Sequence, residues 1–386
     1  FLRFCQKPAR ALVKSISYAS TGSMTACNDT IDNDADGLID MQDMGCTSLT
    51  DTSEQNPIVI VDPSGDDSND GDVVHDAMKT PSGAQTRVQE LISNGVSQDI
   101  YVLLRDGVYY MSSPLTLTPD DMDASRRVIW QSYPGERASL TTGRAINVWS
   151  FSGGVFRASA SGSPFLSMSR NGLVTAARMP NNGYYRAQTR HSRSSFGYNP
   201  ADILGPFIYD DAYVYIYNEH NNTASLVPIA NADWVSHTLY LAKAVPFTIQ
   251  TDDQYYLLNA PDFLDINEEF YYNSSDGSLF YQTASNPTIN SPVIPQNEHI
   301  IEIIGQNSTN LTKRITIQNM TIFAANADTI QSYDAARSIG ALYVQNATQI
   351  ELLDLVIQDV GGYGIVMDNY VQNSLIDGND IKQTGV

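Results

Sequence analysis

The sequence predicts an all-β protein whose C-terminal part is a parallel β-helix. Short apolar runs alternate with Gly, Pro, Asp and Asn along most of the 386 residues, as in barrels, sandwiches and β-solenoids. Apolar residues near the C-terminus repeat at about 23 to 24 residues, the length of one β-helix coil. With 42% hydrophobic and 17% charged residues, the composition excludes a disordered chain and a long coiled coil.

The charge of the chain narrows the classes of partner. The 22 Lys and Arg residues are outnumbered by 43 Asp and Glu residues, which gives a net charge of −21. A nucleic acid or an anionic membrane would be repelled, so both are excluded as partners. No apolar run approaches the roughly 18 residues of a transmembrane helix. We therefore expect a neutral, cationic or metal partner.

Residues 1–26 form the first segment and carry basic residues but no acidic ones. This pattern is typical of the end of an export signal, and a plain basic tail fits it equally well. Removal of the segment with a signal would also remove Cys5 and leave an even number of cysteines.

Residues 27–56 form the second segment and contain a candidate calcium-binding loop. Its oxygen ligands follow the spacing of an EF-hand loop, with Gly37 at the sharp turn and a backbone carbonyl after it. The candidate ligands are Asp32, Asp34, Asp36, Leu38, Asp40 and Asp43. Hard oxygen ligands at this spacing suit calcium. Asp43 departs from the pattern, because Glu at this position reaches the ion with both oxygens. A solvated acidic loop is the alternative.

Residues 57–146 are expected to form a helix and the first strands of the β-helix. Residues 58–61 are an apolar strand that ends at a run of turn-forming residues. Ala84, Val88 and Leu91 have helical spacing, and Asn94-Gly95 supplies the stop. Further short strands are expected at 100–104, 108–110, 115–117, 128–130 and 138–140.

Residues 301–386 carry the repeat that identifies the coils. The apolar set that begins at Leu352 recurs 24 residues later, which is the length of one coil. A matching set lies 35 residues before it, and this longer step corresponds to one coil plus about 11 residues. The three sets are Leu352, Leu355 and Ile357, then Ile376, Asn379 and Ile381, and earlier Ile317, Met320 and Ile322. The pattern still runs at Val386, and an open solenoid end needs a cover. We therefore expect either further coils or self-association through this end.

Two stretches resemble known families. CNDTIDNDADGLIDMQDMGC resembles the thrombospondin type 3-like calcium repeats of secreted bacterial proteins, and this implies that the flanking Cys27 and Cys46 pair. The stretches IVIVDPSGDDSNDG, YVLLRDGVYYMSSPLTLTPDD and IWQSYPGERASLTTGRAI resemble the first coils of secreted right-handed β-helix carbohydrate enzymes. The stretch TAARMPN and residues 255–282 and 340–381 follow them along the chain. The order of all these stretches is similar to that in the glycoside hydrolase family 141-like group.

This second resemblance implies the rest of the organisation. Residues 147–300 would be a β-rich insertion. The coils before it and the coils of residues 301–386 after it would belong to one right-handed β-helix. The protein would be extracellular or attached to the cell surface, and its partner would be a polysaccharide or another glycan.

The resemblance also implies chemistry based on two carboxylates. One acts as an acid and the other as a base or nucleophile, at separations that adjacent coils supply. The candidates in the repeat of residues 301–386 are Asp359, Asp380, Asp368 and Asp377. Each of them is also explained as a solvated turn residue in an acidic chain.

Two residues of the insertion are candidates for substrate binding. Arg178 matches the Arg-before-Pro pattern of the group, and its guanidinium can grip a carboxylate or a pair of hydroxyls. A structural ion pair is the alternative. His191, in a basic loop, is the second candidate.

Three functions from different classes remain open. The first is a secreted glycoside hydrolase that acts on a plant or algal polysaccharide. The second is a non-catalytic adhesin or filament-forming protein, which the open end and the 22 tyrosines favour. The third is a polysaccharide lyase, which would need a Lys or Tyr base and a nearby Arg.

Overall fold

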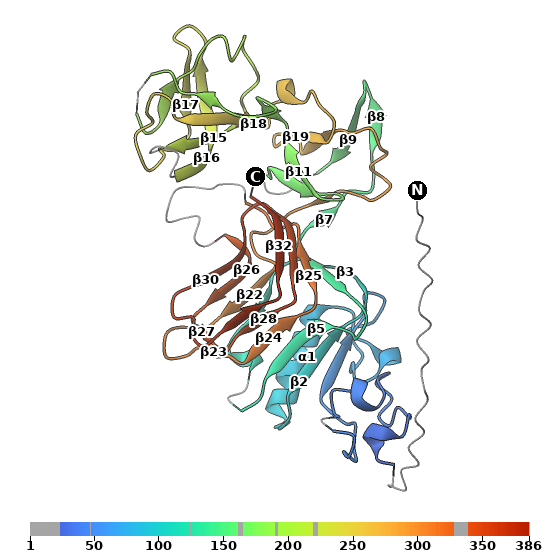
Figure 1. The fold of residues 1–386 in the computed structure, drawn as a ribbon. Helices are drawn as coiled ribbons and strands as arrows, with labels where there is room; N and C mark the ends of the chain where they lie inside the picture. Colours follow the sequence, from blue (N-terminus) through green and yellow to red (C-terminus); the bar gives the residue numbers. More distant parts are fainter. Residues whose placement is uncertain are drawn as a thin grey trace, which may run out of the picture. The chain divides into compact units, whose positions relative to one another are not determined.

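The computed structural model describes residues 24–46, 48–122, 125–160, 165–189, 192–218, 223–327 and 339–385. The chain divides into two compact units, Phe1–Gln55 and Asn56–Val386. The described residues contain one α-helix, α1 (Pro81–Ser93), among many strands, which confirms the predicted all-β class (Figure 1). No helix in these ranges is both long and apolar enough to cross a membrane.

The first unit is a small loop structure with little regular secondary structure. It contains two short 3-10 helices, η1 (Ala26–Asn28) and η2 (Asp40–Gln42). A disulfide joins Cys27 and Cys46, whose Cα atoms are 5.6 Å apart. This bond confirms the predicted pairing, and it closes a 19-residue separation around the acidic residues.

Three parallel sheets form the larger part of the second unit. Each sheet combines early and late segments of the unit, so the blue-green β2 and β5 share a sheet with the orange to red β24 and β28 in Figure 1. The first sheet contains β1 (Ile58–Val61), β2 (Ile100–Leu104), β5 (Val128–Ser132), β24 (Ile315–Gln318), β28 (Glu351–Leu353) and β31 (Leu375–Asp377). The second contains β3 (Gly107–Tyr110), β6 (Ala138–Thr141), β25 (Thr321–Phe323), β29 (Val356–Val360) and β32 (Asp380–Thr384). The third contains β4 (Leu115–Leu117), β22 (Ile301–Ile304), β26 (Gly340–Gln345) and β30 (Tyr363–Asp368).

The strand register confirms the predicted repeat. Leu352 pairs with Ile317 on one side and with Ile376 on the other. Ile357 lies in the same way between Ile322 and Ile381. The residues aligned from the sequence are therefore neighbours in adjacent strands, because each inward-facing apolar residue must cover the one in the next coil.

The apolar rows of the three parallel sheets form one core, and asparagines occur where the chain passes between strands of these sheets. Trp130 and Leu140 are almost fully buried within this core. Asn319, Asn346 and Asn373 have φ values of 51°, 48° and 48°. Asparagine tolerates this left-handed conformation better than most residues, which explains why it recurs where the chain turns from one sheet to the next. A further parallel pair, β23 (Thr312–Lys313) with β27 (Ala347–Thr348), lies at one such turn.

Helix α1 ends at the predicted Asn94, and its start is capped by Thr80. The Thr80 hydroxyl accepts a hydrogen bond from the Gly83 amide at 3.0 Å, and Pro81 occupies the first turn. Ala84 and Val88 are buried in the coil core. Asn94 caps the other end.

Two mainly antiparallel sheets lie between β6 and β22 in the chain. The eight-stranded sheet contains β7 (Arg144–Ala145), β21 (Val293–Ile294), β10 (Ser167–Ser169), β11 (Leu173–Ala176), β19 (Glu269–Asn273), β20 (Ser278–Gln282), β9 (Val155–Ser159) and β8 (Ser150–Ser152). The seven-stranded sheet contains β12 (Arg178–Met179), β18 (Gln254–Leu258), β15 (Tyr213–Asn218), β16 (Thr223–Asp233), β17 (Thr238–Leu241), β14 (Ser195–Gly197) and β13 (Tyr185–Arg186). One apolar cluster is shared by the two sheets, and a second lies within the part of the chain that forms the seven-stranded sheet.

Candidate functional site

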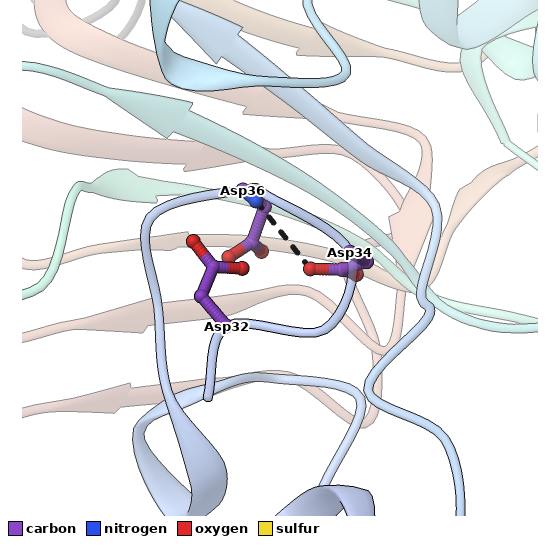
Figure 2. A group of neighbouring side chains, drawn as sticks. All are labelled: Asp32, Asp34 and Asp36. Atoms are coloured by element: carbon purple, nitrogen blue, oxygen red, sulfur yellow. Dashed lines mark hydrogen bonds between the residues drawn. The ribbon is translucent and has the colours of Figure 1, made fainter. Parts of the chain in front are cut away.

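The acidic loop of the first unit gathers carboxylates as the spacing predicts. Figure 2 shows the side chains of Asp32, Asp34 and Asp36 turned toward one another. One carboxylate oxygen from each lies within 4.8 Å of the others. Asp32 also accepts hydrogen bonds from the amides of Ala35 and Gly37, at 2.7 and 3.0 Å. The loop is therefore folded around these carboxylates, in an arrangement that could hold a metal ion.

A second acidic group includes a residue that the spacing does not indicate. Asp34, Asp43 and Glu54 also place carboxylate oxygens within 4.8 Å of one another. Glu54 is 1% exposed and accepts hydrogen bonds from the amides of Asn33 and Asp40, at 2.6 and 2.7 Å. It lies outside the twelve-residue loop pattern, so only the fold brings it in.

Two other predicted ligands have different surroundings. The Asp40 carboxylate accepts hydrogen bonds from the amides of Asp29 and Thr30, at 2.9 and 3.2 Å, and belongs to neither acidic group. The Leu38 side chain is buried, at 3% exposure.

Burial makes the negative charge of this loop costly without a cation. Desolvation raises the pKa of Asp36 to about 7 and that of Asp43 to about 6, and neighbouring carboxylates add to both shifts. Burial also raises the pKa of Asp34. A bound divalent ion would compensate this repulsion.

The four candidate catalytic carboxylates lie on all three parallel sheets. Asp377 ends β31 and is exposed, and its carboxylate accepts a hydrogen bond from the Gly378 amide at 3.0 Å. Asp380 begins β32 and forms an ion pair with Lys382 at 2.8 Å. In the register Asp380 lies beside Val356, so it is offset from Asp359 by three residues.

Asp359 is buried where β10 of the insertion packs against β29. It is 2% exposed, and the Ser169 hydroxyl donates a hydrogen bond of 2.5 Å to its Oδ2 atom. Burial raises the pKa of Asp359, while Ser169 and the more distant Lys382 act in the opposite direction. Its φ of 54° is unusual for a non-glycine residue. The hydrogen bond from Ser169 to Asp359 therefore connects the eight-stranded sheet to the second parallel sheet.

Asp368 differs from the other three, because it ends β30 on a sheet face that carries further polar side chains. The Tyr343 hydroxyl lies 3.5 Å from its Oδ2 atom. Burial, then the charge of Asp368 and finally that of Glu302, raises the pKa of Tyr343. Glu302 was not indicated by the sequence, because an isolated outward glutamate on a strand resembles any solvated residue.

The Arg178 guanidinium packs against aromatic rings. Its guanidinium carbon is 3.9 Å from the centre of the Tyr256 ring and 5.5 Å from that of Tyr184. Its Nη2 atom donates to the Gly183 carbonyl at 2.6 Å. Tyr256 in turn stacks on Tyr215, with centroids 4.9 Å apart. His191 lies outside the described residues.

Glu269, on β19, is a further buried carboxyl beside Arg178. It is 5% exposed, and its Oε1 atom accepts a hydrogen bond from the Arg178 amide at 3.3 Å. Burial raises the pKa of Glu269 to about 7. No sequence motif marks it, since its burial results from the pairing of β19 with β11 and β20.

Comparisons with known proteins bear on the fold. The sequence matches no protein-family profile and no curated protein. A solved glycoside hydrolase is similar in structure, with a TM-score of 0.72 and 16% identity over 84% of this chain. The match covers 65% of that protein, so the chain spans less than two thirds of its length. At this identity the similarity shows a shared fold.

Two other structures are less similar. One is XylC in complex with xylose, with a TM-score of 0.33 and 10% identity, covering 85% of this chain and 53% of that one. The other is a tailspike of Acinetobacter baumannii bacteriophage AP22 in complex with capsular saccharide, with a TM-score of 0.16 and 9% identity, covering 78% and 47%. Neither TM-score adds to the fold assignment.

Proposed function

We propose that this chain is an extracellular carbohydrate-active protein, a glycoside hydrolase that cleaves a plant or algal polysaccharide with paired carboxylates. The observation that carries the proposal is the fold shared with a solved glycoside hydrolase over 84% of the chain. The three parallel sheets and their matched registers support a right-handed parallel β-helix of the family 141-like type. The Cys27–Cys46 disulfide supports an oxidising, extracytoplasmic location.

Calcium is the proposed cofactor of the first unit. The two groups of carboxylates supply hard oxygen ligands, which suit calcium better than a soft metal. Asp32, Asp34, Asp36, Asp43 and Glu54 would hold the ion. Bound calcium would stabilise the loop and remove the repulsion between its acidic groups.

The test is incubation of the oxidised protein, in the presence of calcium, with a panel of xylan, pectin, alginate and carrageenan. A hydrolase releases new reducing ends, whereas a lyase releases unsaturated products that absorb in the ultraviolet. An adhesin releases no product, but its migration in affinity electrophoresis is slowed by a polysaccharide in the gel. Reducing ends without unsaturated products support the proposal, and either of the other two results contradicts it.

A further inference from the structure

The outward face of the third parallel sheet, formed by β4, β22, β26 and β30, carries a row of polar side chains. Glu302 pairs with Thr116 on one side and with Tyr343 on the other. Tyr343 pairs in turn with Val366. Asp368 lies two residues beyond Val366 on β30, and because side chains alternate along a strand it shares the same face.

The contacts within this row are specific. The Thr116 hydroxyl donates a hydrogen bond of 2.8 Å to Glu302. At the other end the Tyr343 hydroxyl lies 3.5 Å from Asp368. Tyr343 is 8% exposed, whereas both carboxylates are half-buried. The tyrosine therefore stands between two carboxylates that solvent can reach.

A pocket of about 320 Å³ opens beside Glu302. Apart from Pro114, every side chain around it is polar or ionisable, which fits a ligand rich in hydroxyl groups. The polar side chains are Gln296, Asn297, Glu298, His299, Glu302 and Asn326.

His299 connects this pocket to the row. Its Nδ1 atom lies 2.7 Å from the Gly340 carbonyl, and since a carbonyl only accepts, Nδ1 carries the hydrogen. In the neutral ring Nε2 is then an acceptor for a hydroxyl. The ring also stacks on Tyr343, with centroids 4.9 Å apart and an interplanar angle of 17°. The His299 ring is thus held by the Tyr343 ring and by the Gly340 carbonyl.

From this arrangement we propose that Glu302 and Asp368 are the paired carboxylates of hydrolysis, with His299 and Tyr343 positioning the sugar between them. The inference rests on the proposed function and names the site at which it would occur. Asp359, Asp377 and Asp380 lie on the other two sheets, so none of them shares this face.

The spacing of the strands favours a single-step hydrolysis. Neighbouring strands are about 4.8 Å apart, so the Cα atoms of Glu302 and Val366, two strands apart, are separated by roughly 10 Å. Asp368 lies two residues, about 7 Å, further along β30, which places its Cα atom roughly 12 Å from that of Glu302. Side chains that lean toward each other across Tyr343 would bring the two carboxyl groups to the roughly 6.5–9.5 Å of a single-step mechanism more readily than to the roughly 5 Å of a covalent one. The larger separation leaves room for a water molecule.

In that step one carboxyl group protonates the leaving glycosidic oxygen while the other, as carboxylate, takes a proton from water. The bond from the anomeric carbon to the leaving oxygen breaks as the bond to the water oxygen forms on the opposite side. Both carboxyls return to their starting states by proton exchange with solvent. The product has inverted anomeric configuration.

The experiment compares Glu302→Gln and Asp368→Asn with the wild type on the polysaccharide of the panel that is cleaved fastest. Glu90→Gln is the matched control, because Glu90 is an exposed residue of α1 in a surface pair with Arg87. We expect each test variant to lower kcat at least about 100-fold with a melting temperature near that of the wild type, and the control to keep wild-type kcat. Proton NMR of the first product should show inversion.

The outcomes separate this inference from the proposed function. A wild type that cleaves while either test variant keeps wild-type kcat overturns the inference alone, and so does a product of retained configuration. A test variant that melts far below the wild type is replaced by Glu302→Asp or Asp368→Glu, which keep the charge but move the carboxyl group. Full activity of such a shifted variant also overturns the inference. A wild type that cleaves no polysaccharide overturns the proposed function and the inference with it.

Discussion

At the scale of single residues, the buried Glu269 is a carboxyl whose environment disfavours its charge. Burial raises its pKa from 4.5 to about 7. A raised carboxyl pKa means that the folded state binds more protons than the unfolded state between these two values. Stability is therefore greatest below the unfolded pKa, and it falls as the pH rises toward the folded pKa.

Glu269→Gln should remove this dependence, because a neutral amide keeps an acceptor for the Arg178 amide and has no charge to bury. We expect the variant to be more stable than the wild type at pH 8, by on the order of 1–3 kcal/mol, and about equal to it at pH 4.5. Chemical denaturation at both pH values measures the difference. An equal gain at the two pH values would show that packing, rather than ionisation, is responsible.

Asp36 provides a second residue-scale test, directed at the proposed calcium. It is fully buried and belongs to the first acidic group. Asp36→Ala should weaken calcium binding at least about tenfold, since it removes one hard oxygen ligand. Titration calorimetry measures the affinity, and Asp29→Ala, outside both acidic groups, is the control. Limited proteolysis with and without chelator should show calcium-dependent cutting only before about Pro57.

At the scale of elements, the contact between β10 and β29 joins the eight-stranded sheet to the second parallel sheet. Ser169 donates to the buried Asp359 at 2.5 Å, and within the part of the chain that the structure describes the Oδ1 atom of Asp359 has no hydrogen-bond partner. The hydrogen bond from the Ser169 hydroxyl therefore offsets part of the free-energy cost of burying this carboxylate.

Ser169→Ala should destabilise the second unit by about 1–3 kcal/mol, because a buried charge loses its donor. The loss should be larger at pH 8 than at pH 4, since Ser169 lowers a pKa that burial raises and its removal leaves the ionised form less favoured. Hydrogen exchange of residues 165–176 and 356–360 reports it locally. Ser275→Ala, at an exposed hydroxyl between β19 and β20 of the eight-stranded sheet that bonds to the nearby Asn273, is the comparison, and equal effects of the two changes would contradict a specific role for Asp359.

The same elements show what could be predicted from the sequence. The coils could be aligned because Leu352 and Ile376 must face one core, and an apolar requirement leaves a periodic signal. The insertion could not be predicted strand by strand, because its antiparallel pairings join distant segments such as β9 and β20. Local spacing contains no information about such partners.

At the scale of the whole molecule, some residues of the candidate sites could be predicted from the sequence and others could not. Asp32, Asp34 and Asp36 were predictable, because their ligand spacing is contained in one loop. Glu54 and Glu302 were not, because only folding brings each beside its neighbours. A polar residue at an outward position has no periodic signature of its own, so its role depends on tertiary structure.

The return of the chain to the edge of β5 also has a consequence for biosynthesis. Val128 pairs with Ile315, which is translated 187 residues later. At about 5–20 residues per second, the ribosome needs roughly 10–40 s to supply that partner. During this interval the apolar β5 edge, with Trp130, is an open template for strands of other nascent chains. Slower translation of residues 133–314 should therefore increase aggregation.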